Sequence, residues 1–523
     1  MNNIQHQGIF SDKTSPLYNY TQELLLEPNQ ESSFSVDTFK DYCAKTYQPF
    51  AFVIHNKSTQ EYFGARDHLG VTPFFYCFQK NKLFFSNKLK DLLQHPEITP
   101  IINDEWLIRH LNNYEEAEDE TSYSNIFRLA PAHILHIKNG TLRTSSFWEM
   151  PQPKTLNISR HEACEVFRSK LTQAVKKCLP KNNQLVACEL SGGVDSSSIT
   201  AIANLLGNPV HAFTHASSNG NDERNLVNDF LKMHPKISHS LIAKHKVDLA
   251  KEVQWATHTL GQVPRAGIAE FSMQLLSAAS QTGAQIIFSG FGGDEGVSQR
   301  ATGCAHAEFI KNRQWGHLYR EAKNYRPFFW PYTFCHIIYK YFFKSKPLFF
   351  DNSLNQDFLK KEYRLPPQQL QQGLPRKSTF EYTKYLLPDR VHTAQRFEED
   401  FQIASEFGLK YRYPLMDIEL INFFNSLPAY CKVYLNQNRY LFRNETMADL
   451  MPQTIRHNFD KSIGGSTIPG VSENLNSLDK ELDKEFMLKF IDQQYLQNHR
   501  NQKGFSFPIY PIIACEAMYN SLK

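Results

Sequence analysis

The residues best suited to chemistry form one short run. Ser191-Gly192-Gly193-Val194-Asp195-Ser196-Ser197 joins the apolar segment QLVACEL to the helix-forming segment SSITAIANLL. Glycines let the backbone approach an anion closely, and free N–H groups at the start of a helix favour negative charge. The pattern predicts a phosphate-binding loop between a strand and a helix. A simple helix-capping turn is the alternative.

Asp195 puts a carboxylate in the middle of this predicted anion site. Such a carboxylate is explained if it holds Mg²⁺ that bridges to the phosphate. The hydroxyls of Ser191, Ser196 and Ser197 are further donors. No lysine follows the glycines at Walker spacing, so the loop is not a P-loop.

A second loop repeats this arrangement. The apolar run QIIF ends at Ser289-Gly290, and Asp294-Glu295 follows in the sequence SGFGGDEG. If both strands belong to one parallel sheet, both loops lie at the same edge. We therefore expect Asp195 and Asp294 to bind one Mg²⁺–pyrophosphate group from two sides.

The elements around the loops predict an α/β fold. From about residue 160, apolar strands alternate with amphipathic helices, which is typical of a parallel sheet covered on both faces. Beyond Arg300 the strand signals fade and helical patterns dominate. We predict two domains, a small β-rich one over 1–150 and an α/β one over 151–523 with a helical insert at about 301–376. Residues 1–45 are polar and weakly patterned, and Asn139-Gly140 predicts a hairpin turn.

Composition narrows the class of protein. Of 523 residues, 41% are hydrophobic and 21% charged, and the net charge of +4 gives no support for nucleic-acid binding. The nine cysteines occur singly without a CxxC pair, so a zinc site is not expected. Odd cysteine number and the lack of a signal peptide favour a reducing, cytoplasmic setting.

Residues 328–350 are strongly apolar and aromatic, but lysines and prolines interrupt them before the roughly 20 residues that a membrane span needs. A buried or partner-facing helix is the favoured interpretation, and a peripheral membrane contact is the alternative.

The motifs resemble a known superfamily. LSGGVDSS is similar to the pyrophosphatase loop of N-type ATP pyrophosphatases, and SGFGGDE is similar to the second loop of their asparagine synthetase branch. The segments GARDHLGVTPFFY and GLKYRYPLMDIELINFFNSLP are also similar to that branch, so the resemblance covers nearly the whole chain. It implies the parallel-sheet fold of that superfamily, after a truncated glutaminase-like domain, and the use of ATP with release of AMP and pyrophosphate.

The resemblance also assigns roles to residues. It implies that Asp195 and Asp294 hold Mg²⁺, and that Lys461 stabilises charge on the α-phosphate, although a surface lysine is the alternative. The residues that it places at the nucleotide are Leu190, Ser191, Gly192, Gly193, Asp195, Ser196, Ser197, Thr214, Ser289 and Gly290. Within the acidic run 398–400, Glu398 is a candidate base for the attacking amine, and a solvated helix face is the alternative.

Two departures from asparagine synthetases bear on the substrate. Those enzymes hydrolyse glutamine with a cysteine directly after the initiator methionine, where this chain has Asn2. They also carry a glutamate at the position of Phe291, thought to help ammonia attack, and β-lactam synthetases carry a tyrosine there. We therefore expect no glutamine hydrolysis and an altered site for the amine.

The pattern is most similar to lasso-peptide macrolactam synthetases, which have a shortened, cysteine-free N-terminal domain and a long helical insert. This resemblance implies a precursor peptide as substrate, with a leader-peptide-binding protein and a cysteine protease as partners. The alternatives are an asparagine synthetase-like enzyme using free ammonia, a β-lactam synthetase-like cyclase, and a degenerate scaffold.

Overall fold

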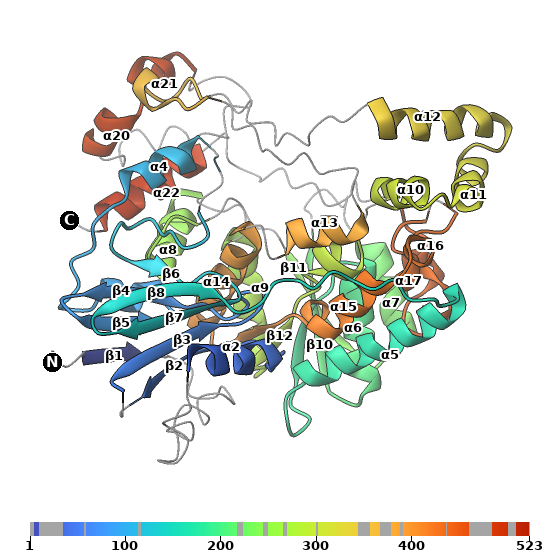
Figure 1. Ribbon diagram of the computed structural model, residues 1–523, viewed down its shortest axis with the longest axis horizontal. Helices are drawn as coiled ribbons and strands as arrows, with labels where there is room; N and C mark the ends of the chain where they lie inside the picture. Colours follow the sequence, from blue (N-terminus) through green and yellow to red (C-terminus); the bar gives the residue numbers. More distant parts are fainter. Residues whose placement is uncertain are drawn as a thin grey trace.

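The structure is a computed structural model of the chain. It describes residues 5–9, 35–56, 59–112, 114, 117–216, 223–243, 249–264, 269–299, 302–343, 356–366, 378–387, 391–435, 437–459, 484–499 and 509–521. These residues form a β-sandwich, a parallel sheet flanked by helices, and a mainly helical region (Figure 1).

The β-sandwich consists of two four-stranded sheets. One has the order β1-β5-β4-β6, with β1 (Gln5–Ile9), β5 (Lys82–Ser86), β4 (Phe75–Gln79) and β6 (Phe127–Arg128). The other has the order β2-β3-β7-β8, with β2 (Ala51–Asn56), β3 (Glu61–Arg66), β7 (His133–Lys138) and β8 (Thr141–Ser146). Alternate residues of β3 and β7 face the first sheet, so that Tyr62 and Leu135 share a core with Tyr76 and Phe85. The predicted hairpin turn is confirmed, since Asn139 and Gly140 both have positive φ between β7 and β8.

Helices cover both outer faces of the sandwich. On one face, α2 (Val36–Lys45) packs Phe39 and Cys43, one turn apart, against Phe52 and Ile54 of β2. On the other face lie α4 (Asp104–Leu111) and the C-terminal helices α20 (Lys484–Phe490) and α22 (Ile509–Asn520). Two segments of the weakly patterned residues 1–45 nevertheless form regular elements. Strand β1 pairs with β5 through its backbone, and α2 begins at a Ser35 capping box that shows little in overall polarity.

The third sheet, of five strands, is entirely parallel. Its order is β11-β10-β9-β12-β13, with β11 (Ser238–Ala243), β10 (Val210–Ala216), β9 (Val186–Glu189), β12 (Ile286–Phe288) and β13 (Lys410–Arg412). The predicted α/β class is therefore confirmed. Strand β13 corrects the expectation that strands end before Arg300, because three residues are too few to show a period.

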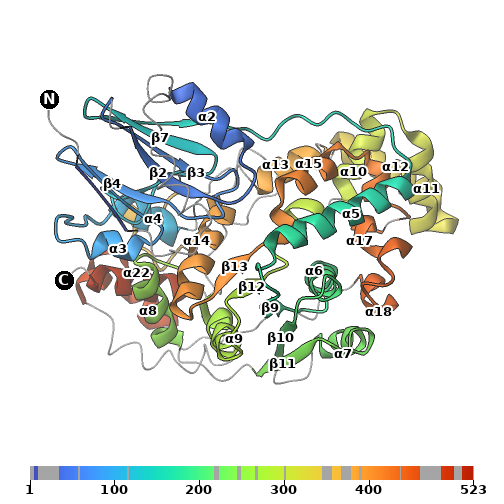
Figure 2. The same ribbon diagram turned by 90° about the horizontal axis from the view of Figure 1, so that it is seen from below.

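Helices cover both faces of this sheet, as a parallel sheet requires. Figure 2 shows α6 (Val194–Leu205) and α7 (Arg224–Met233) on one face, with α9 (Ala269–Gln281) and α14 (Val391–Glu406) on the other. The long helix α5 (Arg160–Cys178) packs on α6 and on α15 (Ile418–Ser426). These helices hold the carboxyl ends of β9 and β12 next to each other at one edge.

In the described part of the predicted insert, the α-helices are α10 (Thr302–Lys311), α11 (Trp315–Tyr325) and α12 (Trp330–Phe343). Phe309, Leu318 and Phe334 form a small core with part of the C-terminal region. For residues 328–350 we expected a buried or partner-facing helix. Helix α12 is only partly buried, because Tyr332 is 64% exposed, Phe342 is 61% exposed, and Phe328 just before the helix is 94% exposed. Residues 344–350 lie outside the described residues. Within the described part of the chain, no helix is long and apolar enough to cross a membrane.

Candidate active site

The first predicted loop adopts the strand–loop–helix arrangement. Strand β9 ends at Glu189, and α6 begins after Gly193 with its free N–H groups facing the loop. The Ser196 hydroxyl accepts from the Ser191 N–H at 3.2 Å and lies 3.1 Å from the Ser191 hydroxyl. Gly192 has a φ of +66°, which favours glycine. The loop is therefore closed on itself and presents a helix N-terminus to the strand edge.

Two of the residues predicted to contact the nucleotide, Leu190 after β9 and Thr214 on the neighbouring strand β10, are hydrogen-bonded to each other. The Thr214 hydroxyl on β10 donates to the Leu190 carbonyl at 2.6 Å, and His239 on β11 lies 3.0 Å from the same hydroxyl. Burial lowers the pKa of His239, which favours its neutral form. The β9–β10 side of the loop is thus a fixed polar surface beside the helix start.

The second predicted loop packs directly on the first. A Cβ atom placed on Gly290 would lie 2.9 Å from the backbone nitrogen of Ser196, so only glycine allows this approach. The Ser289 hydroxyl accepts from the Phe291 N–H at 3.3 Å. The chain then forms one π-helical turn, η2 (Gly293–Val297), which carries Asp294 and Glu295. A π-helical turn is a frequent feature of functional sites.

One arginine joins the two predicted metal ligands. Arg439 Nη1 lies 3.1 Å from Asp195 Oδ2, and its Nη2 forms an ion pair with Asp294. The Arg439 side chain is only 3% exposed, and its φ of +59° is unusual for a residue with a side chain. The expected meeting of Asp195 and Asp294 at one edge is therefore present. Sequence reasoning gave no role to Arg439, which directly precedes the short helix α17 (Tyr440–Arg443).

The carboxylates suit a Mg²⁺ ion. Asp195 Oδ1 is buried and accepts no hydrogen bond from the described residues. A Cβ atom on Gly293 would lie 2.6 Å from this oxygen, so the glycine keeps the space beside it open. The described residues contain no group of three or more His, Cys, Asp or Glu side chains that would hold a metal alone. Two carboxylates fit an ion that takes its other ligands from phosphate oxygens and water, as Mg²⁺ prefers.

Glu398 lies elsewhere and has other partners. Its Oε1 is 2.9 Å from Arg66 Nη1 and its Oε2 is 3.4 Å from Arg128 Nε, and all three side chains are at most 1% exposed. Both arginines belong to the β-sandwich, so Glu398 links that sandwich to α14. The solvated-face interpretation was wrong for residues 398–400, because all three are buried. With both oxygens next to guanidinium groups, Glu398 is poorly placed to accept a proton. Lys461 lies outside the described residues.

Phe291 occupies an aromatic and cationic corner beside the second loop. Its ring lies 5.4 Å from the ring of Phe397 and 6.2 Å from that of Tyr413, both edge-on. The guanidinium carbon of Arg396 lies 4.2 Å from the centre of the Phe291 ring. A phenyl ring cannot accept a proton, so Phe291 cannot act as a base. The charged group at this corner is the guanidinium of Arg396.

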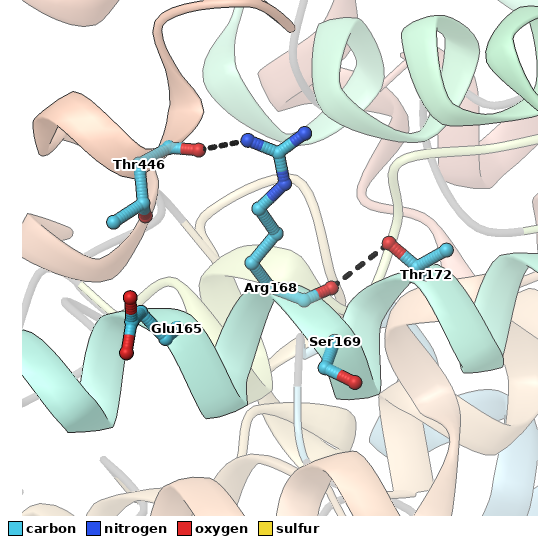
Figure 3. Close-up of a pocket in the computed structure, with 5 residues that line it drawn as sticks. All are labelled: Glu165, Arg168, Ser169, Thr172 and Thr446. Carbon is cyan, nitrogen blue, oxygen red and sulfur yellow. Dashed lines mark hydrogen bonds between the residues drawn. The ribbon is translucent and has the colours of Figure 1, made fainter.

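A shallow cavity of about 390 Å³ lies apart from the predicted site residues. It is lined by Glu165, Arg168, Ser169, Thr172 and Thr446, mainly on the outer face of α5 (Figure 3). Arg168 donates to the Thr446 carbonyl and forms two ion-pair contacts with Asp449. Since its cation is already satisfied, this cavity is a weak candidate for an anion site.

The cysteines of the sandwich have no features of a nucleophile. Cys43 is buried, and burial raises the pKa of its thiol to about 12. Burial also raises the pKa of Cys77 to about 11. A thiol with so high a pKa contains very little thiolate at neutral pH. Asn2 lies outside the described residues.

The family model described as Asparagine synthase matches residues 166–499, which is more than half of the chain and includes both loops. The chain belongs to the asparagine synthase family. A second model, Glutamine amidotransferase domain, matches residues 39–148 and thus most of the sandwich. The resemblance seen in the sequence is confirmed at the level of the superfamily.

Several curated proteins are similar to parts of this asparagine synthase family chain. Asparagine synthetase (glutamine-hydrolyzing) 3 of Bacillus subtilis is 32% identical over 29% of this chain and 25% of its own length. Putative asparagine synthetase (glutamine-hydrolyzing) 2 of Methanocaldococcus jannaschii is 26% identical over 53% of this chain and 56% of its own length. Amidase chry2 of Gibberella zeae is 27% identical over 38% and 31%. The matched regions therefore span between a quarter and just over half of these relatives.

Among solved structures, NMN synthetase from Francisella tularensis matches 27% of this chain and 58% of its own, at 17% identity and a TM-score of 0.18. A likeness this weak adds nothing to the assignment of the fold.

Proposed function

We propose that this chain is an ATP-dependent carbon–nitrogen ligase that activates a carboxylate as its adenylate and releases pyrophosphate. The observation that carries this proposal is the convergence of Asp195, Asp294 and Arg439 at the ends of two parallel strands. Membership of the asparagine synthase family supports the same reaction class. Two carboxylates and a helix N-terminus suit a Mg²⁺–triphosphate group, and no lysine of the Walker type is involved.

The chain's own residues would act by positioning and by neutralising charge. The N-terminus of α6 and the hydroxyls of Ser191, Ser196 and Ser197 would bind the pyrophosphate part of ATP. The Leu190 and Thr214 side of the site would receive the nucleoside. Asp195 and Asp294 would hold Mg²⁺, which screens the charge of the leaving pyrophosphate when bound. Lys461 is proposed to stabilise the α-phosphate.

We propose further that the substrate is a precursor peptide whose own N-terminal amine attacks the adenylated Asp or Glu side chain, giving a macrolactam. Phe291 supports this proposal, since it removes the acidic group expected for an ammonia-using enzyme. The surface of α11 and α12 also supports it. Several aromatic side chains there are exposed and do not only pack the helical region: Trp315, Tyr319, Tyr325, Phe328 and Tyr332. Arginine and lysine side chains at 320, 323 and 326 lie among them.

Holding both reacting groups on one peptide gives a high effective concentration and limits loss of the adenylate to water. A leader-peptide-binding protein and a cysteine protease are the partners that such a substrate would need. The second candidate, asparagine formation from aspartate and free ammonia, is favoured by the similarity to the Bacillus subtilis synthetase.

The proposal is tested by pyrophosphate exchange with ATP and Mg²⁺, run in parallel with L-aspartate plus ammonia and with a processed precursor peptide. We expect exchange with the peptide, and AMP as the stoichiometric product of amide formation. Formation of ADP would exclude the whole reaction class. Exchange with aspartate alone, together with asparagine formation, would replace the macrolactam proposal by the second candidate.

A further inference from the structure

Arg396 is a charged group beside the second loop to which no role has yet been given. It belongs to α14, and its guanidinium carbon lies 4.2 Å from the centre of the Phe291 ring. Phe291 directly follows Gly290, which contacts the start of α6. The guanidinium is therefore held close to the residues that form the predicted adenylation site.

The neighbours of Arg396 fix the position of its side chain. Its Nε lies 3.5 Å from Asp400 Oδ2 and makes no hydrogen bond among the described residues. Asp400 itself accepts from the Tyr413 hydroxyl at 2.8 Å, so its orientation is set by β13 and the turn after it. The Arg396 side chain is 34% exposed, whereas that of Asp400 is 3% exposed. Part of the Arg396 side chain is thus exposed, and its Nε lies near a fixed carboxylate.

The protonation states of neighbouring groups leave the positive charge in place. The carboxylates of Asp400 and Glu189 raise the pKa of Arg396 above its usual value, despite the opposing effect of burial. Burial raises the pKa of Asp400 and also that of Glu189, which accepts from the Tyr411 hydroxyl at 2.7 Å. Arg396 therefore keeps its proton and its positive charge at neutral pH.

The position of Arg396 relative to the parallel sheet indicates which part of the substrate it contacts. The proposed nucleoside side is at β9 and β10, where Thr214 lies, and the metal ligands follow β9 and β12. Helix α14 packs on β13, which is the outermost strand on the side of the sheet away from β10 (Figure 2). A group approaching from this side reaches the loops from the direction opposite to the nucleoside.

We propose that Arg396 binds the substrate carboxylate that is to be adenylated. This proposal rests on the proposed function. A carboxylate approaching the anionic phosphates of ATP is repelled, and an arginine edge can hold it through two parallel hydrogen bonds. One carboxylate oxygen forms a bond to the α-phosphorus while the bond from that phosphorus to pyrophosphate breaks, and no proton moves. The acyl group then carries no carboxylate charge, so its hold on Arg396 weakens as the amine attacks.

The test measures pyrophosphate exchange for the wild type, Arg396→Ala and Arg396→Lys, with L-aspartate, L-glutamate and a peptide library whose members each carry one Asp or Glu. We expect the KM for the carboxylate probe to rise on the order of 10- to 100-fold in Arg396→Ala, the range for hydrogen bonds to a charged group. The KM for ATP should change little. Arg396→Lys should recover part of the loss, since lysine keeps the charge but not the planar fork.

Arg168→Ala is the matched control, because Arg168 is equally exposed at 34% and lies on the outer face of α5. It should leave both KM values unchanged. An unchanged carboxylate KM in Arg396→Ala, or an equal rise in the ATP KM, would overturn the role of Arg396.

A binding measurement separates this role from the proposed function. With α,β-methylene-ATP and Mg²⁺ present, the same carboxylate probes should raise the melting temperature of the wild type and of Arg168→Ala, but not of Arg396→Ala. Nucleotide alone should stabilise all three proteins, which shows that the variants are folded. Probe binding without exchange in the wild type would refute the ligase proposal and support the role of Arg396. Equal stabilisation of the wild type and Arg396→Ala, or stabilisation of neither, would refute that role.

Discussion

The β-sandwich and the parallel sheet both bury charged side chains, but they use them differently. In the sandwich, the buried side chains of Arg66 and Arg128 form ion pairs with Glu398 of α14, and Arg66 also donates to the carbonyls of Gly70, Thr72 and Leu129. At the edge of the parallel sheet, Asp195 and Asp294 share Arg439, and one Asp195 oxygen is left without a described donor. Buried ion pairs between two regions of the chain hold those regions together. A carboxylate oxygen that is left without a donor at the end of a strand can instead bind a ligand. The comparison predicts that sandwich variants change stability and sheet-edge variants change chemistry.

The largest effect is expected for Glu398→Ala. Removing this carboxylate leaves two buried guanidinium groups without their counter-charge, which costs about 3–5 kcal/mol in comparable buried pairs. Urea denaturation should show this loss in the free energy of unfolding. Glu406→Ala on the same helix is the control, because Glu406 is 39% exposed and lies 3.8 Å from Lys88, where the cost should stay below about 1 kcal/mol. Equal effects of the two variants would show that Glu398 does not join the two regions.

Asp195→Ala should have the next largest effect, this time on chemistry. We expect pyrophosphate exchange to fall on the order of 100-fold or more, the usual cost of losing a group that stabilises charge in a transition state. The melting temperature should change little, since the variant removes only one partner of Arg439. Asp229→Ala, an exposed pair with Lys232 on α7, is the control. Pyrophosphate release at the wild-type rate would show that the metal is held elsewhere.

A smaller effect is expected from Gly290→Ala. The added Cβ atom would lie 2.9 Å from the Ser196 nitrogen, a backbone atom that cannot move aside cheaply. We expect about 1–3 kcal/mol of lost stability from overpacking, together with slower exchange as the loops separate. Gly316→Ala in α11 has no atom within 4 Å of the new Cβ and should be neutral or slightly stabilising. Wild-type exchange in Gly290→Ala would mean that close contact between the loops is not required.

The smallest effect concerns the cysteines. Buried Cys43, with its pKa of about 12, should remain unmodified when the folded protein is treated with iodoacetamide, whereas exposed Cys335 should be alkylated. Peptide mass spectrometry measures both sites at once. The purified protein should also release no glutamate from glutamine. Rapid alkylation of Cys43, or glutamate release that is lost in Cys43→Ser, would give the sandwich a chemical role that its structure does not indicate.

Local patterns predicted the parts of the site that depend on neighbouring residues. The glycines and serines of the first loop, the apolar run before it and the helix after it all lie within about twenty residues, so the strand–loop–helix unit could be read directly. The same holds for the second loop and for the Asn139-Gly140 turn. The boundary near residue 150 and the role of Lys461 stay predictions.

Contacts between distant residues were missed for the opposite reason. Arg439 meets Asp195 across 244 positions in the chain, and no spacing rule connects them. Glu398, Glu399 and Asp400 look like a solvated acidic run because a sequence gives no sign of which helix face another domain will cover. Strand β1 also depends on a remote partner, since it is held by pairing with β5.

The sequence by itself determined the family, the α/β class and the two acidic loops, because each depends on patterns among residues that are close together in the chain. Only the tertiary structure decided what surrounds them. In the folded chain, Arg439 pairs with both Asp195 and Asp294, Glu398 pairs with arginines of the sandwich, and Arg396 contacts the ring of Phe291. These choices follow from packing, which fixes the direction of each side chain by the surfaces that must be buried. A single helix, α14, thereby contacts the sandwich through Glu398 and the second loop of the site through Arg396.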